Sequence, residues 1–199
     1  MGTRSSIGVH VNGKDKLTYN QCDGYPTGMG QEVFKQVCDL IQSEGWDKVK
    51  KMAVKMRQVK SNRKFTAKQK EKYGQYWEQV STGDDMYSLL RGMQGELGLM
   101  LKEGIMTESN AFIYDSLFCE WAYILNVDEK TFEIYQGFQK EPPKAGRYKD
   151  EPADNGYYAC NLIYTIQLSD DLNHLYNALA IDDDFWSKLE NEEIIEETA

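Results

Sequence analysis

Short segments that alternate apolar and polar residues open the chain. Residues 4–12 and 15–21 each have the pattern of a β-strand. Asn12 and Gly13 between them favour a tight hairpin turn, because both residue types adopt positive φ readily. The following segment 23–30 contains three glycines and one proline, so the strand pattern ends in a Gly-rich loop.

Apolar residues then recur at three- and four-residue steps, which is the spacing of amphipathic helices. The first predicted helix follows the loop and ends near Gly45. A basic helix comes next, then one capped by Thr66, and then one that ends at Gly104. The ranges predicted for these three later helices are 46–59, 66–80 and 84–102.

The C-terminal half changes to β-branched and aromatic residues. Segments 118–127 and 131–138 flank a polar turn and predict the clearest hairpin of the chain. Residues 139–156 hold three of the four prolines and predict an exposed loop, and 157–168 predict a buried strand. Two further helices are predicted over 171–181 and 185–193.

This order of elements predicts an α+β fold, in which an antiparallel sheet of about five strands carries segregated helices. With 199 residues, one domain over 1–185 is expected. Within it, 46–104 forms a helical insertion or subdomain. Residues 186–199 are expected to be an acidic C-terminal tail.

Composition excludes several classes of protein. Hydrophobic residues make up 41% and aromatic residues 12%, which is typical of a packed globular protein. No apolar stretch approaches the ~20 residues of a membrane span, so no membrane partner is expected. The four cysteines form no CxxC pair, and only His10 and His174 could assist them as ligands. We therefore expect no metal, no cofactor and a reducing, cytoplasmic location.

The net charge of −9 is divided unevenly, with +7 over residues 1–80 and −16 over 81–199. The basic excess lies mainly in 48–72, where Glu71 is the only acid. Such a cluster could bind a protein partner or nucleic acid, although a solvated face of an amphipathic helix explains it equally well. The acidic tail and the Trp-rich helices are also compatible with a homodimer. The predicted partner-binding residues are Lys50, Lys51, Lys55 and Arg57.

Polar residues gather where the first two strands end and the Gly-rich loop begins. Glycines there permit close approach of a ligand, and free N–H groups at the next helix start could hold a phosphate or carboxylate. Asp23 would then orient a hydroxyl or base, and Tyr25 would stack. Alternatively, these residues only build the turn, with Arg4 paired to Asp23. The predicted ligand-binding residues are Arg4, Asn20, Asp23, Tyr25, Gly28 and Gly30.

The segments MGTRSS and QCDGYPTGMG resemble the N-terminus of a family of small phage, prophage and fungal proteins. These proteins begin MGTRS or MGTRG and carry a QWDGYP-like motif before a glycine. The likeness covers about the first 35 residues. Cys22 stands where the relatives have an aromatic residue, so the resemblance does not extend to ring stacking at that position.

The resemblance implies a phage accessory protein that acts in the host cytoplasm, binding a host protein or a small phosphorylated ligand to counter host defence. The alternative is a small hydrolase or transferase with an N-terminal-nucleophile-like arrangement around Arg4, Asn20 and Asp23. That alternative is disfavoured by its chemistry, because removal of Met1 would expose Gly2 and leave Thr3 without a free α-amine. We therefore expect binding rather than catalysis.

Overall fold

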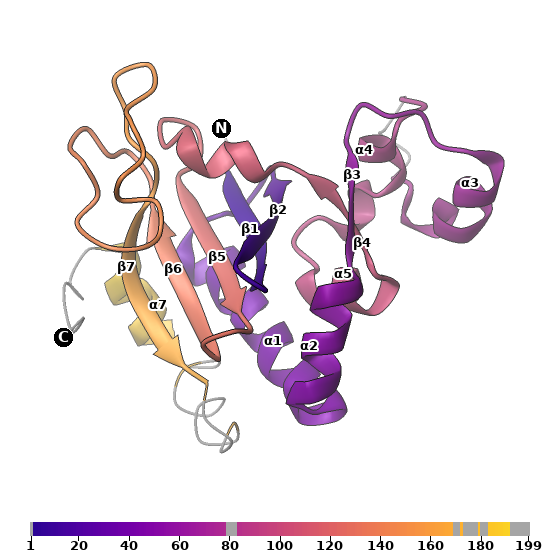
Figure 1. Cartoon of the computed structure of the whole chain (residues 1–199), viewed down its shortest axis with the longest axis horizontal. Helices are drawn as coiled ribbons and strands as arrows, with labels where there is room; N and C mark the ends of the chain where they lie inside the picture. The colour runs from indigo at the N-terminus through magenta and orange to yellow at the C-terminus, as the bar shows by residue number, and fades with distance from the viewer. Residues whose placement is uncertain (1, 79–82, 169–171, 173–178, 180–182, 192–199) are drawn as a thin grey trace.

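The computed structural model describes residues 2–78, 83–168, 172, 179 and 183–191. Its centre is a five-stranded sheet with the order β2-β1-β5-β6-β7 (Figure 1). The strands are β1 Ser5–Val11, β2 Lys14–Asn20, β5 Trp121–Asn126, β6 Thr131–Gln136 and β7 Asn161–Gln167. The α+β class and the five strands are as predicted.

Two predicted hairpins are confirmed. Asn12 and Gly13 adopt φ of 52° and 69°, which turn β1 into antiparallel β2. Lys130, with a φ of 56°, ends the turn between antiparallel β5 and β6.

The prediction of a purely antiparallel sheet is wrong, because β1 pairs with β5 in parallel, from Ser5 beside Trp121 to His10 beside Asn126. Parallel neighbours need a long crossover connection, and the chain between β2 and β5 provides one. The sheet is therefore mixed.

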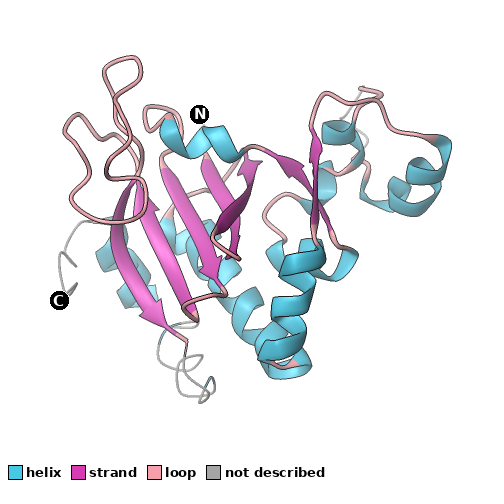
Figure 2. Cartoon of the chain, in the orientation of Figure 1, coloured by secondary structure: helices cyan, strands magenta, loops and turns pink. Residues whose placement is uncertain are grey.

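Helices cover one face of the sheet (Figure 2). They are α1 Gln31–Glu44, α2 Trp46–Lys55 and α7 Asp183–Glu190. A short π-helix, η1 Pro26–Gly30, directly precedes α1. Ile7 and Val9 of β1 alternate toward this face and are fully buried in the main hydrophobic cluster. Trp186 and Leu189 are also buried there, so the beginning of the predicted acidic tail belongs to the folded chain.

The opposite face is covered by a 3₁₀-helix, η4 Asn110–Tyr114, and by the segment 139–160. The latter contains no helix or regular strand, as predicted for the loop over 139–156. It nevertheless packs onto the sheet. Buried residues of this second cluster include Leu17, Ile113, Ala122, Ile124, Tyr135 and Tyr148.

The predicted helix over 46–59 is too long. It ends at Lys55, Met56 is extended, and Arg57 begins strand β3 Arg57–Lys60. This strand pairs in parallel with β4 Ile105–Glu108 and was not predicted. The Nζ of Lys16 donates hydrogen bonds to the carbonyls of Ala53, Val54 and Met56, which caps the C-terminus of α2 at this point.

The helices predicted over 66–80 and 84–102 are shorter than expected. Thr66 does cap α3 Ala67–Tyr73 through a capping box, and the 3₁₀-helix η2 Gly74–Tyr76 follows. Residues 84–102 are broken into α4 Met86–Leu89, η3 Arg91–Met93 and α5 Leu97–Glu103. Gly95, with a φ of 83°, separates the last two, and Gly104 ends α5 as predicted.

The block 46–104 contacts the rest of the fold at several places. Helix α2 contacts β1, α5 contacts α1, and Arg91 donates to Gln21 just after β2. Helices α3 and α4 lie at the far right of Figure 1, away from the five-stranded sheet. The helix predicted over 171–181, including His174, lies outside the described residues except for Leu172 and Leu179.

Candidate functional site

The start of β1 and the end of β2 lie side by side, with Ser5 opposite Asn20. This pairing brings Arg4, Asn20 and the following turn together, as the sequence predicts. The backbone N–H of Gly24 donates to the carbonyl of Thr3 at 3.0 Å. A Cβ at Gly24 would lie 2.8 Å from the Arg4 carbonyl carbon, so only glycine allows this close contact.

Asn20 holds the turn in place. Its side chain is buried, and its amide donates to the Oγ of Ser5 at 3.2 Å and to the carbonyl of Cys22 at 2.6 Å. These bonds occupy the donor that a ligand would need. Asn20 is therefore a positioning residue in this structure.

Asp23 is exposed at the tip of the turn and has a positive φ of 54°. Its carbonyl accepts a hydrogen bond from the N–H of Met29 at 2.8 Å. Arg4 pairs with Glu120 and not with Asp23, so the ion pair proposed to stabilise the turn is not observed. The exposed Asp23 carboxylate faces solvent, and ligand binding by it stays a prediction.

Tyr25, Gly28 and Gly30 are packed against neighbouring parts of the chain. Tyr25 is half-buried and packs on the main hydrophobic cluster. A Cβ at Gly28 would lie 2.7 Å from the Asp23 carbonyl oxygen, and one at Gly30 would lie 2.8 Å from the Tyr123 ring. Both glycines thus permit close backbone packing, and no open space for a ligand lies beside them.

The N–H groups at the start of the helical segment already have acceptors. The N–H and Oγ1 of Thr27 both donate to Oε2 of Glu190 on α7, at 3.3 and 2.6 Å. The next N–H groups, from Gly28 to Gln31, donate to carbonyls of the turn itself. A carboxylate of the chain therefore occupies the position predicted for a bound anion. An external anion would have to displace Glu190.

Arg4 lies at the edge of this region. Its guanidinium carbon lies 4.8 Å from the centre of the Phe118 ring, and its Nε lies 3.9 Å from Oε1 of Glu120. That oxygen instead accepts the backbone N–H of Arg4 at 3.1 Å. The buried Nε of Arg4 has no hydrogen-bond acceptor among the described residues. The guanidinium is thus held mainly by stacking.

Arg91, at the start of η3, reaches the same turn and was not identified from the sequence. Its Nη2 donates to Oε1 of Gln21 at 2.8 Å, and its Nη1 donates to the hydroxyl of Tyr87. The guanidinium lies 5.3 Å from the Tyr87 ring centre, and Nε lies 3.3 Å from the half-exposed Glu78 carboxylate. Gln21 thereby ties Arg91 to the turn after β2.

Tyr19 lies on β2 just before this turn. Burial is the largest cause of a raised pKa at its hydroxyl, and Tyr87 raises it further. Arg4 and Arg91 both act to lower that pKa. We call Arg4, Tyr19, Gln21, Tyr87, Arg91 and Phe118 the Arg4–Arg91 surface.

A second polar cluster lies near the other end of β1, which we call the Arg147 network. It joins His10, Asp15, Glu133, Tyr135, Arg147 and Tyr148. Nε of Arg147 donates to Oδ1 of Asp15 at 3.2 Å, and Nη1 donates to Oε2 of Glu133. His10 Nδ1 lies 2.7 Å from the same Asp15 oxygen.

The Arg147 network is largely closed. The Glu133 side chain is only 8% exposed, and its second oxygen accepts the Asn126 amide at 2.8 Å. Burial raises the pKa of Tyr148, and Asp15, which accepts its hydroxyl hydrogen bond at 2.7 Å, raises it further. Because most of these groups satisfy one another, the network anchors the 139–160 segment on the sheet. His10 is one of the groups packed and hydrogen-bonded within this network.

The predicted partner-binding residues lie along α2 and the start of β3. Lys50 lies 3.7 Å from the Asp128 carboxylate, whereas Lys51 and Lys55 form no ion pair with any residue in the described ranges. A shallow hollow of about 480 Å³ is lined by Asp47, Lys50, Lys51, Val54 and Lys55. Val54 is 46% exposed, so this basic face includes an apolar position.

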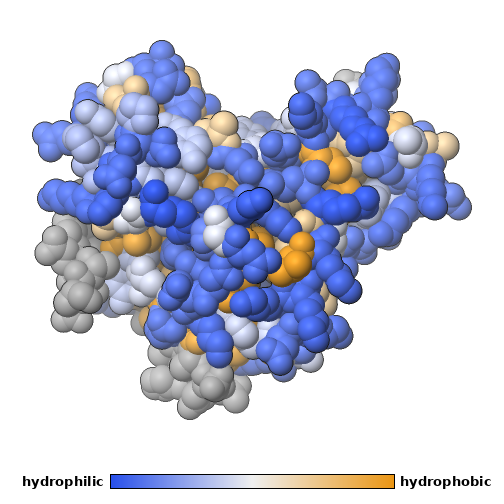
Figure 3. Space-filling view, viewed as in Figure 1, coloured by the Kyte–Doolittle hydropathy of each residue, from blue (hydrophilic) through white to orange (hydrophobic). Residues whose placement is uncertain are grey.

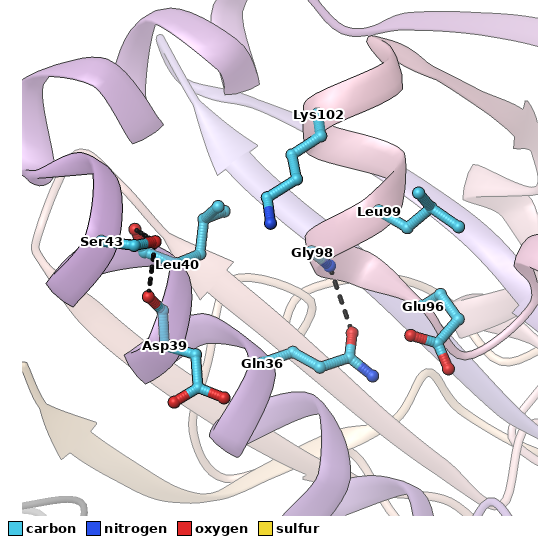
Figure 4. A pocket seen from close by; sticks show the side chains of 8 residues that line it. All are labelled: Gln36, Asp39, Leu40, Ser43, Glu96, Gly98, Leu99 and Lys102. Atoms are coloured by element: carbon cyan, nitrogen blue, oxygen red, sulfur yellow. Dashed lines mark hydrogen bonds between the residues drawn. The ribbon is translucent and has the colours of Figure 1, made fainter.

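A smaller hollow of about 270 Å³ lies between α1 and α5 (Figure 4). The Gln36 side chain crosses it and accepts the N–H of Gly98 at 3.1 Å. Burial raises the pKa of Glu96 at its rim, and Glu32 raises it further. Because the lining contains both acids and Lys102, the hollow favours neither an anion nor a cation.

Comparison with protein-family models, curated proteins and solved structures gives no match. Among the described helices, none is long and apolar enough to cross a bilayer. The described residues also contain no cluster of three or more His, Cys, Asp or Glu that could hold a metal ion. The functional argument therefore rests on the geometry above.

Proposed function

We propose that the chain is a binding protein for a small phosphorylated molecule, which it holds at the Arg4–Arg91 surface. One observation carries the proposal. Two guanidinium groups from distant parts of the sequence lie at the turn after β2, and each is stacked on an aromatic ring: Arg4 precedes Ser5, which pairs with Asn20, and Arg91 donates to Gln21. Stacking fixes their orientation before a ligand arrives, which lowers the entropic cost of binding.

Phosphate suits these arginines better than other anions of similar size. A guanidinium presents several N–H donors in one plane and matches the oxygens of a phosphate group. The acid near Arg4 is a weak competitor, because Glu120 lies 3.9 Å from Nε without a hydrogen bond to it. The acid near Arg91, Glu78, is 47% exposed and can move away at little cost.

Binding is favoured over catalysis by the state of the other polar groups. The Asn20 amide is used by Ser5 and Cys22. In the described part of the chain around the start of β1, no side-chain nucleophile is hydrogen-bonded to a base. The resemblance to phage proteins supports a role in the host cytoplasm, where such a protein would hold a ligand used by host defence.

Isothermal titration with ribose 5-phosphate and inorganic pyrophosphate tests this proposal. Arg4→Ala and Arg91→Ala should each weaken binding by roughly 10- to 100-fold, because each removes charged hydrogen bonds. Arg63→Ala is the matched control, since Arg63 is exposed and has no ion pair with a described residue. Unchanged binding in both variants, or no binding by the native protein, would overturn the proposal.

The basic face of α2 supports a second function, binding of an acidic protein partner. The hollow around Val54 combines an apolar position with Lys51 and Lys55, which have no ion pair with described residues. Charge reversal at Lys50, Lys51, Lys55 and Arg57 should abolish capture of such a partner while the circular dichroism spectrum stays native. Capture that persists in the folded variant would contradict it.

A further inference from the structure

Phe138 has an unusual combination of strain and exposure. Its φ is 57°, in the left-handed region where a bulky residue is rarely found. Its side chain is 54% exposed, the largest value among the exposed large hydrophobic residues of the described chain. The fold thus holds an aromatic ring in water on a backbone that favours glycine or asparagine.

Hydrogen bonds enforce this conformation. The N–H of Phe138 donates to the Ser116 carbonyl at 2.7 Å, and the N–H of Gln139 donates to the Ser116 hydroxyl at 3.0 Å. Ser116 is fully buried. A Cβ at Gly137 would lie 2.1 Å from the Cys119 carbonyl oxygen, so only glycine allows the preceding backbone to pack this closely on the 116–119 segment. Backbone strain that is held in place by surrounding hydrogen bonds and packing is common at binding sites.

The backbone of Phe138 is bonded to the segment that carries Phe118. The N–H groups of residues 137 and 138 donate to the carbonyls of Glu120 and Ser116, which lie on either side of Phe118 in the sequence. The Phe118 ring is 44% exposed and carries the Arg4 guanidinium. Two exposed phenyl rings therefore come from adjoining segments, and one of them carries Arg4.

The face of the molecule in Figure 3 shows that hydrophobic areas are small and interrupted by hydrophilic residues. Only four large hydrophobic residues of the described chain are exposed, and Phe118 and Phe138 are two of them. Phe118 carries Arg4, and Phe138 lies on the adjoining segment, so this part of the surface points to a ligand with both a planar ring and a negative charge.

We propose that the phosphorylated ligand is a nucleotide, whose base packs against Phe118 and Phe138 while its phosphate lies near Arg4 and Arg91. This inference rests on the proposed function and specifies its ligand class. Aromatic side chains bind bases of any sequence through their π-faces, and arginine adds both charge and stacking. A phosphorylated sugar would use the arginines but gain nothing from the two rings.

The test compares the four ribonucleoside monophosphates with ribose 5-phosphate by isothermal titration. At least one nucleotide should bind about tenfold more tightly than ribose 5-phosphate. Phe138→Ala should weaken nucleotide binding by roughly 5- to 100-fold and leave ribose 5-phosphate binding unchanged. Val54→Ala removes an exposed apolar side chain elsewhere and is the matched control.

Phe138→Gly separates binding from folding. Glycine accepts the positive φ, so this variant should unfold at a higher urea concentration while nucleotide binding falls as in Phe138→Ala. A loss of binding together with a loss of stability would instead assign Phe138 a structural role and overturn the inference.

The outcomes also separate the two proposals. Equal affinity for nucleotides and ribose 5-phosphate, unaffected by Phe138→Ala, would overturn the nucleotide assignment and leave phosphate binding intact. No binding of any phosphorylated probe would overturn both. A defined protein complex that Phe138→Ala disrupts, with no small molecule bound, would assign the two rings to a protein partner and exclude the nucleotide.

Discussion

The two arginine-containing regions at opposite ends of β1 use the same side chain in different ways. Arg147 lies inside a network in which Asp15 and Glu133 accept hydrogen bonds from its Nε and Nη1, although its buried Nη2 has no partner among the described residues. Arg4 stacks on an exposed phenyl ring, and its buried Nε has no hydrogen bond with the described residues. Similar chemistry therefore serves the fold in one place and is left open for a ligand in the other.

The difference shows why charge alone does not locate a site. Buried ions stabilise a structure only when their partners are complete, and removing one partner leaves a costly unpaired charge. A partly exposed ion whose guanidinium has no hydrogen bond to a carboxylate contributes little to stability, so Arg4 beside the exposed Phe118 ring needs another explanation. Measuring how much each substitution of a charged group lowers stability tests whether that group serves the fold.

The largest effect is expected for Arg147→Met. This change keeps much of the apolar volume but leaves Asp15 and Glu133 without their shared cation, so the free energy of unfolding should fall by about 3–5 kcal/mol. Urea denaturation measures it, with Arg63→Met as the exposed control. A loss below about 1 kcal/mol would show that the network does not anchor the 139–160 segment.

An intermediate effect is expected for Lys16→Met. Lys16 is partly buried and donates to three carbonyls at the end of α2, at 2.7–2.9 Å. Losing this cap should reduce the free energy of unfolding by about 1–2 kcal/mol. Lys14→Met, an exposed substitution on the same strand, provides the comparison. Equal stability of the two variants would contradict the capping role.

A smaller effect is expected for Asp128→Asn, in the way that the stability of the fold changes with pH. Burial alone raises its pKa, but the N–H groups of Gly13 and Asn12, with Lys50 and His10, outweigh burial and lower it. A lowered pKa stabilises the fold above the usual aspartate range, and this stability is lost as pH falls through the lowered value. The free energy of unfolding, measured by urea denaturation from pH 6 to pH 2, should therefore decline slightly less in Asp128→Asn than in the native protein. The difference should be under about 1 kcal/mol. Identical profiles would exclude the contribution.

The smallest effect on stability is expected for Arg4→Ala. Its partly exposed side chain stacks on Phe118 and faces Glu120 at 3.9 Å, so the free energy of unfolding should change by no more than about 0.5 kcal/mol. The same variant is expected to lose phosphate binding. A destabilisation comparable to that of Arg147→Met would show that Arg4 serves the fold and remove the contrast between the two regions.

Local signals in the sequence predicted local features of the fold. The turn at Asn12 and Gly13 depends on two neighbouring residues, as does the cap at Thr66, so both could be identified directly. The parallel pairing of β1 with β5 depends on residues far apart in the chain, and no short pattern encodes it. Strand β3 was missed because Val59, its one apolar residue, continues the helical spacing of α2.

The candidate site was predicted in part for the same reason. Arg4 and Asn20 meet because a predicted hairpin joins them. Arg91 reaches this place only because Gln21 and Tyr87 orient it, about 70 positions after the turn it contacts. Glu190, which occupies the helix start at Thr27, comes from the last described helix. No spacing rule brings these segments together.

The central position of β1 has a consequence for biosynthesis. The β1–β2 hairpin leaves the ribosome well before the second neighbour of β1, which is Trp121–Asn126. At about 5–20 residues per second, the free edge of β1 stays unpaired for several seconds while the intervening chain is made. An unpaired strand edge is a template for association with other chains. Synthesis of this protein thus includes an interval in which a chaperone that covers strand edges would raise the yield of native molecules.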